Sequence, residues 1–315
     1  MSGAATSVAY FGPAGTFTEQ ALLSQPDYAA AAERRPMATI VDVLDAVHAG
    51  GVDLGFVPIE NGIEGTVPIT LDSLVFDFEL LIQREVVLDI HLALLAHPGT
   101  KVGKVKVVSS YPHALAQCRK FLAANAPDAE HRAAASTADA ARELGEHPDP
   151  TAAVIAPPAA AEVYGLVVLA EAIEDHPENQ TRFVAVARSG VPRATGHDRT
   201  SIVCFQGSDR PGNLHSILGQ FSARAINLTK LESRPTKQGL GDYCFVIDLD
   251  GHIADEIVAD CLRDLHANLA RVKFLGSYPA AGHHAPGRRR EAERSWRDAD
   301  EWVRSLRSQI GEAGS

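Results

Sequence analysis

The chain has 315 residues, which corresponds to about two domains because a domain usually runs roughly 100–200 residues. Its 29 Lys and Arg residues against 40 Asp and Glu residues give a formal charge of -11, which argues against a nucleic-acid partner or an anionic membrane surface. The sequence shows no signal peptide and no apolar run of the roughly 20 residues that span a bilayer. The four cysteines are scattered without a Cys-x-x-Cys pair, so we expect neither a zinc site nor disulfides, and a cytoplasmic location.

The first 190 residues alternate short β-branched runs with helical segments, which is typical of βαβ units around a largely parallel sheet. We expect two such α/β sections, about 6–80 and about 85–172, with a last strand returning to the first section over 175–190. The crossings near 80 and 175 then act as hinges, and a ligand cleft lies between two lobes. The expected strands are 7–11, 52–58, 105–109, 152–156, 166–170 and 182–187, with a strand-rich passage at 80–95, and the expected helices are 16–23, 38–49, 112–123, 138–144 and 159–164.

A polar linker with Pro and Gly at 191–198 precedes a second domain, expected over 200–278. Its order is strand, helix, strand, strand, helix, strand, the ferredoxin-like βαββαβ arrangement. In the tail, residues 279–315, apolar residues recur at helical spacing (Trp302, Leu306, Ile310) and predict an amphipathic helix. The segments of the second domain are 200–205, 213–225, 228–233, 242–249, 255–266 and 272–278.

Two loops that follow strands carry residues suited to binding. Gly-Pro-Ala-Gly at 12–15 leads into a helix whose N-terminus can bind a carboxylate or phosphate; the alternative is a tight turn capped by Thr16 or Thr18. Glu60 and Asn61 end a buried strand, where an open α/β sheet places its ligands. Both side chains can hydrogen-bond a substrate hydroxyl, and an ordinary loop is the alternative.

Two further segments carry candidate residues. Ser110 precedes a helix and is either its cap or a ligand contact, whereas His113 is either a general base or a surface histidine. On the last strand, Thr181 and Phe183 share one face and Arg182 takes the other. The Arg182 guanidinium either clamps a carboxylate of a ligand or pairs with a carboxylate near the hinge.

Together these segments resemble the prephenate dehydratase family. Its motifs occur here in order between Gly12 and Phe183: Gly-Pro-x-Gly-Thr-x-Thr, Pro-Ile-Glu-Asn, Ser-x-Pro, Ala-Leu-x-Gln-Cys and Thr-Arg-Phe. The βαββαβ segment resembles an ACT regulatory domain, with Asp-Arg-Pro-Gly-Asn-Leu at 209–214 and Glu-Ser-Arg-Pro at 232–235. The resemblance implies an α/β catalytic region of the two-lobed type II periplasmic-binding-protein class over residues 6–190.

The resemblance also implies a reaction: conversion of prephenate to phenylpyruvate, water and carbon dioxide, with no metal or organic cofactor. Thr181 is then the residue that donates to the leaving hydroxyl. It acts by hydrogen bonding rather than by protonation, because a neutral threonine is a weak acid. The residues implied to bind prephenate are Thr16, Glu60, Asn61, Ser110, Arg182 and Phe183.

Two motifs depart from the family pattern. Gly62 stands where the family usually has Ser, and Tyr111 and His113 stand where it usually has His and Gln. The alternatives are an arogenate dehydratase, a specialised-pathway lyase acting on a prephenate analogue, and a non-catalytic solute-binding or sensor protein. Related prephenate decarboxylases lack the threonine of Thr-Arg-Phe, so the presence of Thr181 favours dehydration.

The ACT resemblance implies that L-phenylalanine binds at a subunit interface and lowers activity through a two-state equilibrium. The oligomer is then a homodimer or homotetramer, and an ACT module that serves only dimerisation is the alternative. No chorismate mutase segment precedes the dehydratase motifs, so we expect a monofunctional enzyme. The residues implied to hold phenylalanine are Asp209, Pro211, Gly212, Asn213, Leu214, Glu232, Ser233 and Arg234.

Overall fold

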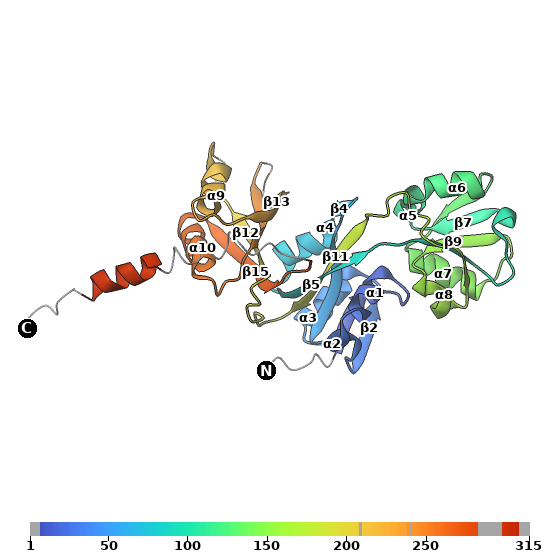
Figure 1. Cartoon of the computed structure of the whole chain (residues 1–315), viewed down its shortest axis with the longest axis horizontal. Coiled ribbons are helices and arrows are strands. Elements are labelled where there is room, and N and C mark those ends of the chain that lie inside the picture. Colours follow the sequence, from blue (N-terminus) through green and yellow to red (C-terminus); the bar gives the residue numbers. More distant parts are fainter. Residues whose placement is uncertain (1–6, 208–209, 238, 240, 283–297, 309–315) are drawn as a thin grey trace, which may run out of the picture. The chain divides into compact units, whose positions relative to one another are not determined.

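The computed structural model describes residues 7–207, 210–237, 239, 241–282 and 298–308, and its contacts divide the chain into two units. The first unit consists of Met1–Leu80 with Glu85–Arg188, and the second of Leu81–Arg84 with Ser189–Ser315. Figure 1 shows the course of the chain through the helices and strands of both units. Within the described ranges, no helix combines the length and the apolar character that crossing a membrane requires.

The first sheet has the order β2-β1-β3-β11-β5, with the short β4 paired to β3. Strand β1 runs parallel to β2 and β3, whereas β11 runs antiparallel to β3. The expectation that the last strand returns to the first sheet is therefore confirmed. The strands are β1 (Ser7–Phe11), β2 (Glu33–Met37), β3 (Leu54–Asn61), β4 (Gly65–Thr66), β5 (Leu81–Asp89) and β11 (Gln180–Ala187), and the helices are α1 (Phe17–Leu23), α2 (Pro26–Ala29), α3 (Ile40–His48) and α4 (Pro68–Asp72), the last followed by a π-helical turn, Ser73–Asp77.

The crossing out of the first sheet lies later than residue 80. Strand β5 continues in this sheet beside β11 as far as Asp89, and the second sheet begins only at Ala93. The physical reason is that β5 still contributes core residues here, since Val86 is buried among the side chains that pack under β11. The first section therefore runs to Asp89, and the crossing occupies the short segment before Ala93.

The second sheet has the order β10-β6-β9-β7-β8. The helix expected over 112–123 is divided at Cys118, because Asp175 N donates to the Gln117 carbonyl at 2.5 Å and the Asp175 carboxylate accepts from Lys120 N at 3.2 Å. One residue of the returning crossing thus ends one helix and caps the next. The elements are β6 (Ala93–Ala96), a 3-10 turn (Val102–Lys104), β7 (Val107–Ser110), α5 (Pro112–Gln117), α6 (Arg119–Asn125), β8 (Glu130–Ala133), α7 (Thr137–Glu146), β9 (Ala152–Ala156), α8 (Ala159–Tyr164) and β10 (Val167–Ala170).

The second unit carries an antiparallel sheet of order β13-β14-β12-β15. The chain order βαββαβ is as expected, and its core joins alternate residues of β12 and β14 to apolar residues of both helices. Residues 298–307 are helical and expose Trp302 and Leu306, while Ile310 lies outside the described residues. The elements are β12 (Asp198–Phe205), α9 (Asn213–Ser222), β13 (Leu228–Pro235), β14 (Tyr243–Asp250), α10 (Glu256–Asn268) and β15 (Arg271–Pro279).

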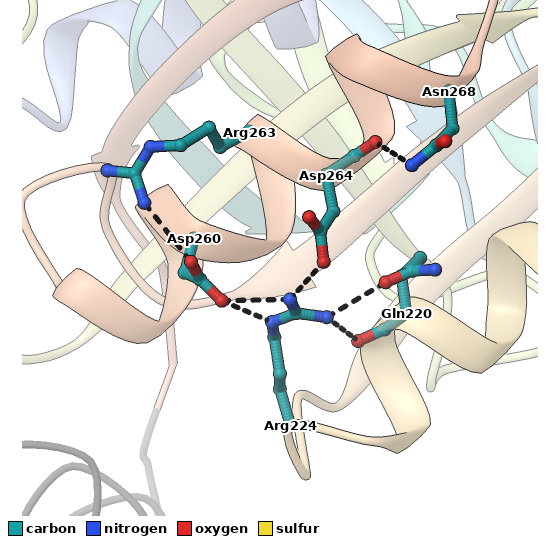
Figure 2. A network of polar contacts seen from close by, with 6 residues as sticks. All are labelled: Gln220, Arg224, Asp260, Arg263, Asp264 and Asn268. Atoms are coloured by element: carbon teal, nitrogen blue, oxygen red, sulfur yellow. Dashed lines mark hydrogen bonds and ion pairs between the residues drawn. The ribbon is translucent and has the colours of Figure 1, made fainter. Parts of the chain in front are cut away.

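Arg224, just after α9, ties this helix to α10 (Figure 2). Its Nε and Nη2 donate to Asp260 Oδ2 at 3.0 and 2.8 Å, and Nη2 also contacts Asp264. Its Nη1 donates to the backbone and side-chain oxygens of Gln220 at 3.1 and 2.9 Å. The guanidinium presents five N–H donors, and these contacts occupy its whole fork, so the pair of helices is held at one geometry.

Candidate functional site

Asn61 and Thr181 lie opposite each other where β3 and β11 pair. The Asn61 side-chain amide donates to Thr181 Oγ1 at 2.8 Å, and its carbonyl oxygen accepts from Ile63 N and Glu64 N, both at 3.0 Å. Asn61 therefore stabilises the tight turn between β3 and β4 through its carbonyl oxygen, and its amide holds the Thr181 side chain. Because Thr181 Oγ1 accepts here, the Thr181 O–H bond points away from Asn61, and it can donate to a ligand.

A second branch of this network reaches the elements of the second sheet. The Asn61 amide also donates to Asn179 Oδ1 at 3.0 Å, and the Asn179 amide donates to Gln117 Oε1 at 3.1 Å. Asn179 is 2% exposed, so these bonds are made away from water. Gln117 ends α5, and the orientation of Thr181 is thereby coupled to the position of that helix.

Glu60 and Arg182 also pair across β3 and β11, one residue along from Asn61 and Thr181. Successive side chains of a strand point to opposite faces, so this pair lies on the face turned away from Thr181. Arg182 contacts Glu60 at 2.9 Å and Glu85 of β5 at 3.2 Å, and Glu85 is 4% exposed. The three charges form a row across three neighbouring strands. This geometry favours the ion-paired alternative for Arg182 over the carboxylate clamp.

Phe183 shares the Thr181 face, as expected, but it lies in the core of the first sheet. Its ring stacks on Phe56 with centroids 5.8 Å apart and planes 8° apart, and only 1% of it is exposed. The surrounding cluster includes Ala21 and Leu22 of α1. Phe183 therefore packs in the core beneath the sheet rather than contacting a ligand, because almost none of its surface is accessible. The same cluster shows that α1 covers the Thr181 face.

Thr16 is the N-cap of α1, and its side chain accepts from Glu19 N at 3.3 Å. Glu19 in turn accepts from Gly15 N at 2.7 Å and from the Tyr10 hydroxyl at 2.6 Å. Burial and the adjacent Glu19 carboxylate raise the pKa of Tyr10 well above its usual value. A carboxylate thus already occupies the start of α1, which favours the capped-turn reading over an anion site in the 12–15 loop.

Tyr164, the last residue of helix α8, fixes the same loop. Its hydroxyl donates to the Ala14 carbonyl at 2.5 Å, and its ring lies over Gly15, where a Cβ would come within 3.2 Å of it. Gly15 has a φ of +78°, a conformation that glycine adopts without the penalty of a side chain. The close approach and the positive φ together explain the glycine at the end of Gly-Pro-Ala-Gly.

Ser110 is neither a helix cap nor a surface contact. It is the last residue of β7, fully buried, and its hydroxyl donates to the Ile155 carbonyl of β9 at 2.5 Å, while Tyr111 takes the N-cap position of α5. Because β7 and β9 are neighbours in the second sheet, the Ser110 hydroxyl reaches the backbone of β9. His113, by contrast, is half exposed, stacks on Tyr111 with centroids 5.3 Å apart and pairs with Glu64 at 2.8 Å. It is a surface histidine rather than a buried base.

A pocket of about 410 Å³ opens in the second unit beside the start of α9. Gly212 is the residue before α9 and has a φ of +90°, and the Asn213 amide donates to Gln206 Oε1 at 2.7 Å. A positive φ at this position lets the backbone turn into the helix beside the pocket. The pocket is lined by Gln206, Arg210, Gly212, Asn213, Leu214, His215, Leu218 and Phe245.

Comparison with known proteins agrees with the motif order. A family model described as prephenate dehydratase matches residues 8–190, and one described as ACT domain matches residues 200–267. The chain belongs to the prephenate dehydratase family. Prephenate dehydratase of Mycobacterium tuberculosis is 42% identical over 293 residues, covering 89% of each chain, and that of Amycolatopsis methanolica is 42% identical over 310 residues, covering 95% of this chain and 97% of the other.

A crystal structure of prephenate dehydratase from Arthrobacter aurescens, solved in complex with L-Phe, has the same fold. It is 41% identical, has a TM-score of 0.88 and covers 96% of this chain and 99% of its own. The family resemblance inferred from the motifs is confirmed, together with the α/β fold class and the ACT domain at the C-terminal side.

In this chain, the structure divides the expected site residues into groups. Asn61 joins Thr181, Glu60 joins Arg182 on the other face, and Gly212, Asn213 and Leu214 join at the pocket. Pro211 is not among the pocket-lining residues. The Glu-Ser-Arg segment lies on the edge strand β13, where Glu232 pairs with Lys230 at 3.3 Å and with Arg234 at 3.1 Å, while Ser233 is exposed. Asp209 lies outside the described residues.

Sequence reasoning missed several members of these groups. Glu85 has no clear signal of its own, because it follows Gln83 and Arg84 in the same strand, whereas Asn179 lies two residues before Thr181 in a polar segment. In the pocket, Leu214, His215 and Leu218 follow helical spacing on one face of α9. Gln206 directly follows β12 and Phe245 lies in β14, and no local pattern connects them to the helix.

No three His, Cys, Asp or Glu side chains gather as metal ligands within the described part of the chain. The four cysteines are buried free thiols. Burial raises the pKa of Cys118, Cys204 and Cys261 to about 12, so these thiols stay protonated and unreactive near neutral pH.

Proposed function

We propose that this protein catalyses the decarboxylating dehydration of prephenate to phenylpyruvate. Membership of the prephenate dehydratase family supports this reaction, and the observation that carries the mechanism is the oriented hydroxyl of Thr181. Prephenate loses a ring carboxylate as carbon dioxide and the para hydroxyl as hydroxide, which becomes water with a proton from solvent. The two electrons left by the breaking carbon–carbon bond enter the ring, which becomes aromatic as the hydroxyl departs.

Thr181 assists the step in which charge develops on the departing oxygen. With its lone pair taken by the Asn61 amide, the Thr181 hydroxyl donates its hydrogen to that oxygen. A donor already aimed at developing charge needs no reorientation during the reaction, which is the basis of its catalytic effect. Since aromatisation supplies the driving force, orientation of the dianion and this one hydrogen bond are the main demands on the protein.

The other residues of the first unit take supporting roles in this proposal. Asn61 orients Thr181, and Thr16 lies at the start of α1, the helix that covers the Thr181 face, where it borders the substrate. Arg182 and Glu60 brace the ends of β3 and β11 from the opposite face. Ser110 braces the end of β7 against β9.

The pocket in the second unit is proposed to bind L-phenylalanine and to lower activity, completing feedback control of phenylalanine biosynthesis in the cytoplasm. The Arthrobacter aurescens relative was solved with L-Phe, and the pocket has polar groups for an amino acid beside apolar Leu214, Leu218 and Phe245. The Glu232 to Arg234 segment does not line this pocket within one chain, which supports a second copy of the chain completing the site in a homodimer or homotetramer.

Turnover of prephenate against arogenate tests the proposal and separates it from an arogenate dehydratase. Phenylpyruvate is followed by its absorbance in alkali, with wild type, Thr181→Val and the matched Thr181→Ser. Wild type converts prephenate, Thr181→Val loses roughly 100-fold or more in kcat, and Thr181→Ser keeps most activity because it retains the hydroxyl. No turnover by wild type, or equal turnover by Thr181→Val, contradicts the proposal. Calorimetry with L-phenylalanine tests the second unit, and no binding at millimolar ligand contradicts that part.

A further inference from the structure

Two residues on one face of helix α5 contact the surroundings of Asn61, one at the turn that follows it and one at Asn179. His113 and Gln117 are four residues apart and therefore lie one helical turn apart on the same side. His113 Nδ1 is 2.8 Å from Glu64 Oε2, and Gln117 accepts from Asn179, which in turn accepts from Asn61. These contacts close a ring that begins and ends at Asn61.

We infer that His113 is a positioning residue for Thr181, acting through Glu64 and Asn61. The inference rests on the proposed function, since it assigns the residue a part in the same reaction.

The connection from His113 to Thr181 passes through three contacts. His113 holds the Glu64 carboxylate, Glu64 N donates to Asn61 Oδ1 at 3.0 Å, and the Asn61 amide donates to Thr181 Oγ1 at 2.8 Å. A shift of Glu64 therefore moves the N–H donor that fixes the plane of the Asn61 amide. Because that amide sets which way the Thr181 O–H points, the histidine affects the threonine without touching substrate.

Protonation of an imidazole adds the positive charge that turns a hydrogen bond to a carboxylate into an ion pair. The carboxylate that faces His113 belongs to Glu64, and the Tyr111 ring stacks on the His113 imidazole. Strands β7 and β9, which pack on α5, consist of Val-Val-Ser-Ser and Ala-Ala-Val-Ile-Ala and carry no titratable side chain. The contact with His113 holds the Glu64 side chain, and the orientation of Thr181 follows it.

The kinetic test compares His113→Gln with wild type at pH 6. Glutamine keeps a hydrogen-bond donor for Glu64 and cannot become charged. The matched control is His176→Gln, because His176 also pairs with a surface carboxylate, Glu178, at 3.3 Å. We expect kcat of His113→Gln to be about three- to fivefold below wild type, the size expected for a solvent-exposed pair. KM stays within about twofold, since ground-state binding is not touched. An unchanged kcat, or a loss matched by His176→Gln, overturns the inference.

Hydrogen exchange supplies a readout that does not depend on catalysis. At pH 6, His113→Gln should exchange the Ile63 and Glu64 amides several-fold faster than wild type, because these amides donate to Asn61 Oδ1. His176→Gln should leave them unchanged. Equal protection in wild type and His113→Gln overturns the inference even if prephenate is turned over. Conversely, changed protection in a protein that does not turn over prephenate contradicts the proposed function and leaves the His113 contact standing.

Discussion

Asn61 lies directly opposite Thr181 across two antiparallel strands, and its side-chain amide donates to the threonine oxygen at 2.8 Å. The Thr181 side chain, to which we assign the catalytic hydroxyl, is thus held by the residue opposite it in the sheet rather than left to rotate. A freely rotating hydroxyl would lose rotational freedom when substrate binds, and the amide removes that freedom in advance.

Replacing Asn61 with Asp should reverse this hydrogen bond. A carboxylate accepts rather than donates, so Thr181 turns its O–H towards residue 61 and away from substrate. We expect kcat to fall about 100-fold, with KM within about threefold, the scale of losing one oriented donor. Steady-state kinetics measure both values, and Asn125→Asp on the surface of α6 is the control. Wild-type kcat in Asn61→Asp would show that the amide does not orient Thr181.

The buried row of Glu60, Arg182 and Glu85 should stabilise the first unit as a set. Glu85→Leu leaves Arg182 without its buried partner, and we expect a loss of about 3 kcal/mol in the free energy of unfolding. Adding Arg182→Met should recover part of that loss, because the unmatched charge is then removed too. Urea denaturation of both single variants and the double variant measures the coupling. Strictly additive effects would mean that the two side chains do not interact.

Glu174 should make the first unit sensitive to acid. Burial by itself raises the pKa of this carboxyl, but hydrogen bonds from His91 and from Leu92 N, both at 2.9 Å, outweigh it and hold the pKa below its usual 4.5. A lowered folded-state pKa contributes stability that is present above the unfolded value and is lost as pH falls through the folded one. Glu174→Gln should therefore cost about 1–2 kcal/mol at pH 7 and progressively less below pH 4.5. Thermal unfolding at several pH values measures the difference, and a gap that is constant with pH would refute this account.

Arg224 and Arg263 offer a matched pair in the second unit, since both contact Asp260 (Figure 2). The Arg224 side chain is 16% exposed and bridges two helices, whereas Arg263 is 67% exposed and pairs within α10. Arg224→Met should lower the unfolding free energy by about 2 kcal/mol, and Arg263→Met by less than about 0.5 kcal/mol. Chemical denaturation followed by circular dichroism compares the two, and equal losses would contradict the bridging role.

The cysteines should be inert in the folded protein. Cys118, Cys204 and Cys261 have pKa values raised to about 12 by burial, and Cys244 is buried as well. Only the thiolate reacts quickly, so Ellman's reagent at pH 8 should label none of them within minutes and all four after denaturation. Ser305→Cys, at an exposed helical position, should add one fast-reacting thiol. Rapid labelling of the native wild type would show that one of these sites opens.

Much of the fold was predictable because its signals are local. Apolar periodicity predicted α3, and its start at the Thr39 cap follows from the bond to Asp42 N at 3.1 Å. The edge strands β2 and β8 were not predicted, since their residues are mostly charged and exposed and show no alternation. Their strand form comes from pairing with β1 and β7, which no local pattern encodes.

The sequence by itself determined the order of the motifs, and with it the family and the two kinds of domain. Only the tertiary structure decided what the neighbouring residues do. Arg182 pairs with Glu85, which is 97 residues away in the sequence, and Ser110 donates to Ile155, which is 45 residues away. Phe183 is buried in the core, stacked on Phe56. The physical reason is that a polar side chain acts through its partner and its burial, and both are set by strands and helices that come together from distant parts of the chain.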